Sequence, residues 1–256
     1  MLAKWFSVIK TPYRAALNLD TLRRWLHVLT NKERAGRGLP PVQELTMLED
    51  VAEYHSANMS SRGFFDHVSP EGQRPSDRVR LLHPELLVAV GENIAMVPAD
   101  PEPELAQSLL RKWMESPGHC KNILEPSWTH MGLGFHQCGS YLFATQLFGE
   151  VYGLVLEWER IRRIPLGRET PLKIRFLGRI PRKDVLVLVK FPDPSAIFWA
   201  GNGYYSVGWG ELRGVWNGDI WETSFAPKQG RGVYEVTVGQ KSNGSVLAKG
   251  CVMEVT

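Results

Sequence analysis

The sequence predicts an α+β fold, in which helices cover a sheet in the first part and a smaller, antiparallel β part follows. Helical periodicity dominates up to about residue 150, and two strand-like runs close this part of the chain. Beyond it the helical period is lost, and short β-rich runs alternate with turn residues. We therefore expect an N-terminal segment over 1–19, a helix-covered domain over 20–152 and a sandwich-like β domain over 153–256.

Three amphipathic helices are expected in the first part, because apolar residues recur there at helical spacing. The third helix has to end near Glu115, since Ser116 precedes Pro117 and the residue before a proline disfavours the helical conformation. The expected buried stripes are Leu22, Trp25, Leu26 and Leu29; Leu45, Leu48, Ala52, His55 and Met59; and Leu105, Leu109, Leu110 and Trp113.

A β-hairpin over 129–135 and 141–148 is expected to close the first part, with Gly139 in its turn. In the second part we expect strands within 171–176, 184–191, 203–209, 219–225, 232–238 and 245–255, and a linker or first edge over 159–169. Core packing is favoured over an aromatic sugar-binding surface for four tryptophans of this part. They are Trp199, Trp209, Trp216 and Trp221.

The overall composition indicates an ordinary globular protein. The 30 basic and 27 acidic residues give a net charge of +3 and are mixed along the chain, so they give little support for nucleic acid or an anionic membrane as partner. No stretch is long and apolar enough to span a bilayer. Lys10, Pro12 and Arg14 interrupt the apolar core that a signal peptide needs, so the chain as written is expected to be unexported.

The three cysteines are too few for a disulfide scaffold, and no Cys-x-x-Cys pair suggests zinc. Cys120 and Cys138 either pair in an oxidising compartment, which leaves Cys251 over, or remain free thiols. The sequence does not distinguish these two alternatives.

Three segments carry residues suited to binding or catalysis. His67 lies in a polar turn that Phe64 and Phe65 anchor, and the alternative is a surface histidine without a role. Glu92 lies in an apolar stretch, where a carboxylate must be paired, protonated or ligating, unless it faces a solvated turn. Gly118 is expected to project His119 just past a helix end, and the alternative is a histidine that caps that helix.

In order and spacing, several motifs resemble the CAP superfamily of cysteine-rich secretory proteins, antigen 5 and pathogenesis-related 1 proteins, and most closely its bacterial YkwD-like branch. The resemblance covers roughly residues 20–150 and implies an α-β-α sandwich. The matching pieces are NKER (31–34) with GLPP (38–41), AEYHSANM (52–59), GFFDHVSPEGQRPSDRV (63–79), GENIA (91–95), WMESPGH with NIL (113–124) and the strand over 141–149.

The resemblance implies a cleft with two histidines and one or two acids. His67 and His119 match the histidines and Glu92 matches the first acid, whereas Ser116 stands where eukaryotic members have the second acid. Glu115 lies one position earlier and is the remaining candidate. His67, His119 and Glu92 are therefore expected to hold a divalent, zinc-like metal, or to form a pH-sensitive cluster without metal.

We expect a non-enzymatic binding protein whose cleft holds a divalent metal or a small apolar or lipid ligand, with the β domain attaching it to a partner or a cell-envelope component. The alternative is a zinc-assisted peptidase or cell-envelope hydrolase, in which Glu92 or Glu115 is the catalytic base. A third hypothesis makes the cleft vestigial and the β domain the working surface. The resemblance also implies a secreted or extracellular location, although no signal peptide is visible.

Overall fold

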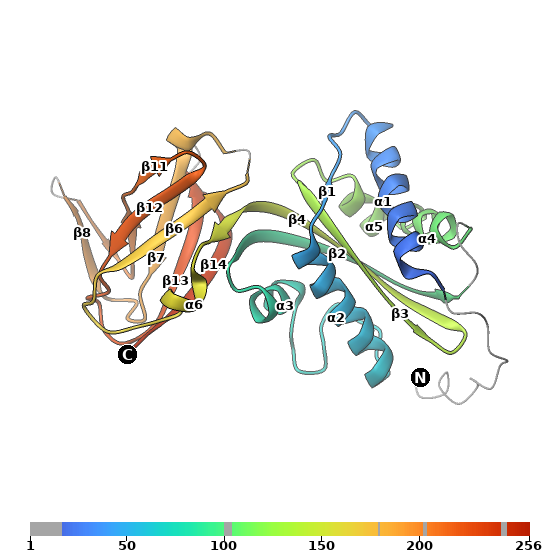
Figure 1. The fold of residues 1–256 in the computed structure, drawn as a ribbon, viewed down its shortest axis with the longest axis horizontal. Helices are drawn as coiled ribbons and strands as arrows, with labels where there is room; N and C mark the ends of the chain where they lie inside the picture. Colours follow the sequence, from blue (N-terminus) through green and yellow to red (C-terminus); the bar gives the residue numbers. More distant parts are fainter. Residues whose placement is uncertain (1–16, 100–103, 179, 202–203, 242–244) are drawn as a thin grey trace. The chain divides into compact units, whose positions relative to one another are not determined.

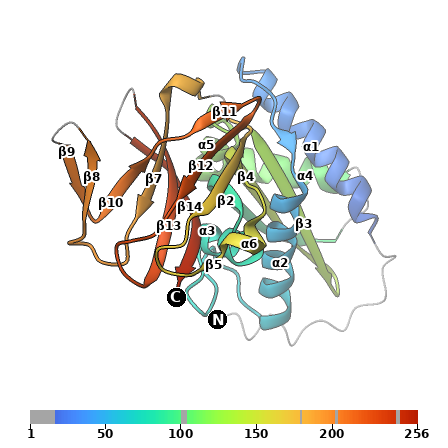
Figure 2. The ribbon, with the colours of Figure 1, turned by 60° about the vertical axis from the view of Figure 1, so that its left-hand side comes forward.

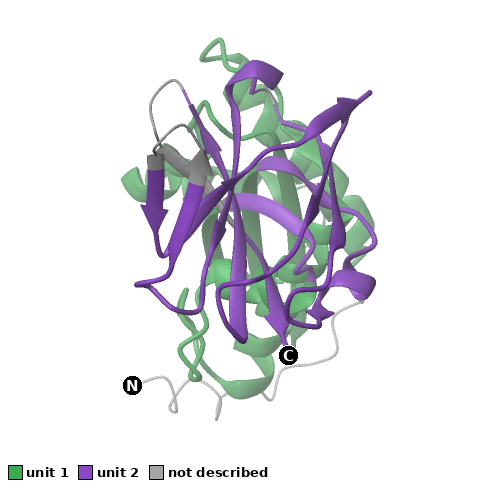
Figure 3. Cartoon of the chain, turned by 90° about the vertical axis from the view of Figure 1, so that its left-hand side faces the viewer, with its two compact units in different colours: residues 1–82, 90–150 green, residues 83–89, 151–256 purple. Residues whose placement is uncertain are grey.

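The computed structural model describes residues 17–99, 104–178, 180–201, 204–241 and 245–256. Most of the expected N-terminal segment, 1–16, lies outside the described residues. The chain divides into two compact units (Figure 3): unit 1 comprises 1–82 and 90–150, and unit 2 comprises 83–89 and 151–256. The sequence predicts domain boundaries at 19/20 and 152/153. These are boundaries between domains that fold independently, so the division into compact units does not test them and they stay a prediction.

Three helices of unit 1 lie where the sequence predicts them, and two shorter ones, over 75–82 and 117–123, were not expected (Figure 1). Asn18 caps the first helix, because its side chain accepts a hydrogen bond from the Thr21 amide at 2.9 Å. Gly63 ends the second helix in the left-handed conformation, with φ of 69°. The helices are α1 (Leu19–Ala35), α2 (Thr46–Arg62), α3 (Pro75–Leu82), α4 (Glu104–Glu115) and α5 (Pro117–Ile123).

The sheet of unit 1 contains the expected hairpin, joined at Gly139, which has a φ of 59°. The strand that contains Glu92 was not expected, because its apolar residues follow one another without the alternation that marks a strand. The strands are β1 (Gln43–Glu44), β2 (Leu86–Pro98), β3 (His130–Cys138) and β4 (Tyr141–Val155); β3 lies between β1 and β4, and β2 pairs with β4.

Alternate residues of β3 face helices on the two sides of the sheet. Gly132 and Gly134 lie against the α2 backbone so closely that a Cβ at either position would overlap it. Leu133 and Phe135 point the other way, into the core that α1 and α4 complete. Unit 1 is thus a sheet with helices on both faces, the mixed α/β arrangement expected for this part of the chain.

The predicted apolar stripes of α1 and α4 contribute their buried residues to this core. Leu22 and Leu26 of α1, and the whole expected stripe of α4, are buried. Trp25 was wrongly placed among the buried residues, because it is 45% exposed. It lies at the edge of the apolar face, where helical spacing alone does not decide burial.

The segment after α4 differs from the expectation. α4 ends at Glu115 as predicted, but a new helix, α5, begins directly, with Ser116 in its cap position and Pro117 as its first residue. His119 therefore lies within α5, and it does not cap the end of α4.

Unit 2 contains two sheets around one core (Figure 2). In one, the order is β10, β7, β13, β14 and β5, and all neighbours are antiparallel except β14 and β5. In the other, β6 pairs with the last residues of β4 and with β12, which pairs with β11. The strands are β5 (Arg163–Ile164), β6 (Thr170–Phe176), β7 (Val185–Lys190), β10 (Trp209–Leu212), β11 (Val215–Asn217), β12 (Ile220–Phe225), β13 (Gly232–Gln240) and β14 (Ser245–Val255).

Unit 2 contains further short elements. The segment 159–169, expected as a linker or first edge, contains β5 at the edge of its sheet and part of a short helix, α6 (Trp158–Ile161), which was not expected. A separate hairpin consists of β8 (Ile197–Gly201), which was not expected, and β9 (Tyr204–Val207), which lies within the strand run expected over 203–209. A 3-10 turn over Arg182–Asp184 precedes β7.

The tryptophans of unit 2 divide into two groups. Trp221 is buried in the core, and Trp216 packs partly buried between Phe176 and the guanidinium of Arg182, so packing was the right interpretation for both. Trp199 and Trp209 are exposed, and the core interpretation was wrong for them. A strand alternates faces residue by residue, and composition does not show which face is covered.

All three cysteines carry free thiols in this structure. Cys251 is buried in the core of unit 2, and burial raises the pKa of its thiol to about 12. It therefore acts as a small apolar core residue.

Candidate functional site

Glu92 lies at the centre of a buried polar cluster in unit 1. Its side chain is only 2% exposed, and both carboxylate oxygens have partners. The Arg78 guanidinium donates to Oε2 at 2.5 Å, and Nδ1 of His67 donates to Oε1 at 2.9 Å. Of the outcomes expected for a carboxylate in apolar surroundings, the structure shows the paired one.

Arg78 was not singled out in the sequence, although it holds the site together. Its side chain is fully buried in α3 and donates to the carbonyl oxygens of His67 and Gln73 at 3.0 and 2.9 Å, as well as to Glu92. The guanidinium thus fixes the His67 loop and neutralises the carboxylate together. The sequence indicated only that a buried Glu92 carboxylate needs a partner. The fold shows that this partner is Arg78.

His67 is half exposed at the rim of this cluster, with 46% of its side chain accessible. The hydrogen bond to Glu92 raises its pKa, more than burial lowers it. Because a carboxylate only accepts, Nδ1 of His67 must carry the hydrogen. In the neutral ring Nε2 then keeps its lone pair for an outside partner.

His55 is a fully buried histidine beneath the cluster. Its Nε2 lies 3.0 Å from the carbonyl oxygen of Asp66 and 3.7 Å from Oε1 of Glu92. Burial lowers its pKa to about 4, more than the charge of Glu92 raises it. It is a hydrogen-bonded core histidine, which supports the loop next to His67.

His119 reaches the site from α5 and is half buried. Burial lowers its pKa, and the charge of nearby His67 lowers it further. The amide nitrogen of Asn93 donates to the His119 carbonyl at 3.3 Å and to Oε1 of Gln146 at 3.0 Å, while Asn122 donates to Asn93 at 3.0 Å. This buried amide network, which the sequence did not indicate, links α5 to β2.

Glu115 lies apart from this arrangement. It is exposed at the end of α4, and among the described residues no hydrogen bond or ion pair joins it to Glu92 or to either cleft histidine. Ser69 is not a free nucleophile, because its hydroxyl donates to Glu71 at 3.0 Å and accepts from the Gln73 amide at 3.2 Å within its own loop.

The described part of the chain contains no group of three or more His, Cys, Asp or Glu side chains arranged to hold a metal ion. A direct bond from Glu92 to a cation is disfavoured, because both oxygens are engaged and a guanidinium lies beside them. His67 and His119 are free of this constraint. The assignment of the three residues to a metal stays a prediction.

Comparison with known proteins identifies the family of this part of the chain. The Cysteine-rich secretory protein family, CAP, matches residues 28–148, a range that contains every residue of the cluster. An uncharacterized Bacillus subtilis protein, YkwD, is 38% identical over 122 residues. Residues 28–148 are a CAP domain. It is of the YkwD-like kind, as the motifs around His67, Glu92 and His119 suggest.

Further relatives share the CAP domain over part of their length. An uncharacterized membrane protein of Bacillus subtilis, YlbC, is 33% identical over 106 residues. The matches cover 48% and 41% of this chain and only 45% and 29% of YkwD and YlbC. A solved extracellular protein of Bacillus anthracis with an SCP domain aligns at 30% identity and a TM-score of 0.44, covering 50% of this chain and 40% of that one.

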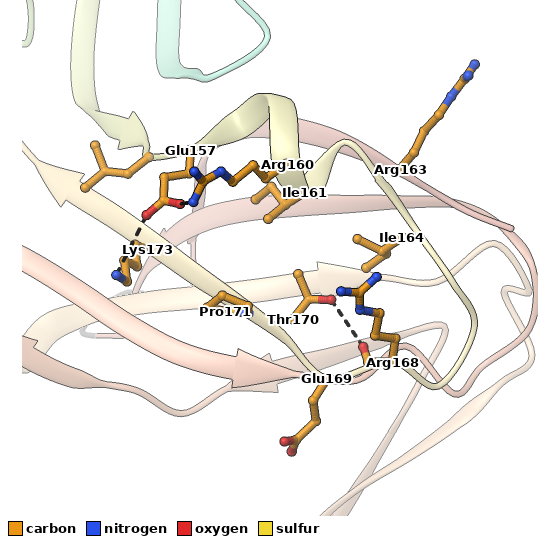
Figure 4. A pocket seen from close by; sticks show the side chains of 11 residues that line it. Glu157, Arg160, Ile161, Arg163, Ile164, Arg168, Glu169, Thr170, Pro171 and Lys173 are labelled. Atoms are coloured by element: carbon orange, nitrogen blue, oxygen red, sulfur yellow. Dashed lines mark hydrogen bonds and ion pairs between the residues drawn. The ribbon is translucent and has the colours of Figure 1, made fainter.

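A hollow lies in unit 2, outside the CAP domain (Figure 4). It has a volume of about 230 Å³ between α6, β5 and the start of β6. Glu157 there pairs with Arg160 at 2.6 Å and with Lys173 at 3.9 Å, and Arg163 pairs with Glu254 at 2.7 Å. These charged side chains are thus paired within the protein, whereas Arg168 and Glu169 also line the hollow.

No helix in the part of the chain that the structure describes is both long and apolar enough to cross a membrane.

Proposed function

We propose that this chain is a non-enzymatic binding module whose CAP domain holds a divalent cation between His67 and His119. The observation that carries the proposal is the bond from Nδ1 of His67 to Glu92, because it directs Nε2 away from the buried cluster. A carboxylate that fixes a metal-binding imidazole in this way is common in metal sites. Arg78 holds the carboxylate in turn.

The proposal changes the role of Glu92. The sequence suggests three direct ligands, whereas the geometry favours two imidazoles with Glu92 as a positioning residue. Water or a bound ligand would complete the coordination of a zinc-like ion, which usually takes four ligands. Such a site is open, so it suits a module that binds a further molecule through the cation.

Turnover is not part of this proposal. Glu92 is held by Arg78 and His67, and Glu115 is exposed elsewhere, so neither is supported as a catalytic base. We further infer that residues 153–256 act as a sandwich-like part that attaches the CAP domain to a partner, since two sheets there enclose most of one core, which Leu87 and Tyr152 complete.

Zinc titration of the full chain by calorimetry tests the cation site. His67→Ala and His119→Ala should each weaken zinc binding at least about ten-fold, and Glu92→Gln should weaken it by about 10- to 100-fold through loss of the positioning bond. His130→Ala is the matched control, because His130 lies on β3 and bonds to Thr129 at 2.8 Å. Circular dichroism establishes that each variant is folded.

Zinc binding that is unchanged in folded His67→Ala and His119→Ala would overturn the cation site. Retention of a small apolar molecule by the metal-free protein, lost in neither variant, would point to the other ligand class. A peptidase or cell-envelope hydrolase activity that zinc restores after chelation would contradict the non-enzymatic proposal.

A further inference from the structure

The hairpin of β8 and β9 in unit 2 has one outward face made of large apolar side chains. Ile197 pairs with Val207 and Trp199 pairs with Tyr205 across the two strands. These residues are two apart on each strand, so all four share one face. Their exposed fractions are 53%, 47%, 69% and 60% in that order, and the rings of Trp199 and Tyr205 are 5.6 Å apart.

The opposite face of the hairpin is anchored in the core of unit 2. Phe198 packs against this core, with its ring 5.8 Å from that of Phe191. Gly210 of β10 makes room for it, since a Cβ there would lie 2.7 Å from Cγ of Phe198. The hairpin lies beside β10 (Figure 2), and its anchored face fixes which side chains point outward. The apolar face is therefore a stable feature of the surface.

Basic residues lie near one end of this apolar face and on the neighbouring strand pair. Ile197 lines an open depression together with Lys228, Arg231 and Asp193. The Asp193 carboxylate is already occupied by the amide and hydroxyl of Ser195, at 2.8 and 2.7 Å. Exposed Lys190 lies opposite exposed Trp209 in the neighbouring strand pair. Segments 190–209 and 228–231 together contain three basic residues and one acidic residue.

We propose that this hairpin docks unit 2 on an anionic lipid surface. Tryptophan and tyrosine beside aliphatic side chains suit the boundary between headgroups and acyl chains, and lysine and arginine suit anionic headgroups. A glycan platform would use the aromatic rings but gains little from Ile197 and Val207. In a dimer through the same patch, the basic residues beside it would repel each other. The net charge of the whole chain does not show this local arrangement.

Co-sedimentation of the full chain with vesicles tests the proposal. Binding is expected to phosphatidylcholine vesicles that contain phosphatidylglycerol, and to be much weaker to pure phosphatidylcholine. The double variant Trp199→Ser, Tyr205→Ser should lose at least about ten-fold in partitioning. Lys228→Gln and Arg231→Gln should each lose about five-fold, and high salt should reproduce this loss.

Trp25→Ser is the matched control, because Trp25 is an exposed tryptophan of α1 in unit 1. It should partition like the unmodified chain. Undiminished partitioning of the folded double variant, or no preference for phosphatidylglycerol, overturns the proposal. Two other results would also overturn the proposal if the chain does not bind vesicles. One is binding to insoluble polysaccharide that depends on the hairpin, and the other is a dimer that the double variant abolishes.

Discussion

At the residue scale, Glu92 and its partners form one unit. A buried carboxylate pairs with a fully buried arginine and with a half-exposed histidine, and His55 packs below them. The arrangement leaves only the outer edge of His67 for chemistry. The charged side chains of Glu92 and Arg78 therefore fix the position of His67.

The free energy of unfolding should depend on pH because His55 is buried in its neutral form. Its pKa is lowered from 6.5 to about 4, so the folded protein binds this proton less readily than the unfolded chain. Its contribution is complete above pH 6.5 and is lost as the pH falls toward 4, by about 3 kcal/mol in all. Urea unfolding of the native chain and of His55→Gln across this range measures the difference.

Other groups titrate in both proteins, so the difference between the two stability curves isolates His55. Parallel curves would show that His55 is equally easy to protonate in the folded and unfolded states.

At the element scale, the contact between α2 and β3 positions the cluster. α2 carries His55, and it can lie close to the sheet because β3 presents glycines to it. Ser56 adds hydrogen bonds to the Gly134 carbonyl at 3.0 Å and to Thr145 at 2.8 Å. The short distance between helix and sheet is a requirement of the site.

Gly134→Ala should destabilise the protein by roughly 1–3 kcal/mol, because the new methyl group would overlap the α2 backbone at Ala52 and Glu53. Gly118→Ala is the control, since no atom lies within 4 Å of a Cβ there. Its effect should stay within about 0.5 kcal/mol. Chemical denaturation measures both, and equal effects would contradict the close approach.

At the scale of the whole molecule, the chain passes between the units more than once. Residues 83–89 belong to unit 2 although they lie within the CAP part of the sequence (Figure 3). Leu87 is fully buried there in a core that includes Tyr152 and Val155, and the Val155 amide donates to the Glu85 carbonyl at 2.9 Å. No single cut near residue 150 separates the two units cleanly.

A fragment of residues 1–152 should therefore be prone to association, because Leu87 loses its core. Leu87→Ser should improve the solubility of the fragment and destabilise the full chain. Gel filtration and thermal unfolding compare the four proteins. A fragment that is monomeric and unfolds cooperatively without the substitution would instead support the predicted boundary at 152/153.

The sequence by itself determined three helices of unit 1 (α1, α2 and α4), the closing hairpin and the CAP family, since periodicity, glycine placement and ordered motifs are local properties. It also identified Glu92, His67 and His119 as the residues to examine. It placed Trp25, Trp199 and Trp209 wrongly, because burial depends on what packs against a face.

Only the tertiary structure decided that Arg78 neutralises Glu92 and that Leu87 belongs to unit 2. The physical reason is the same in each case. The partner of a buried charge or a buried apolar side chain comes from another part of the chain. The local sequence does not show which part the fold brings next to it.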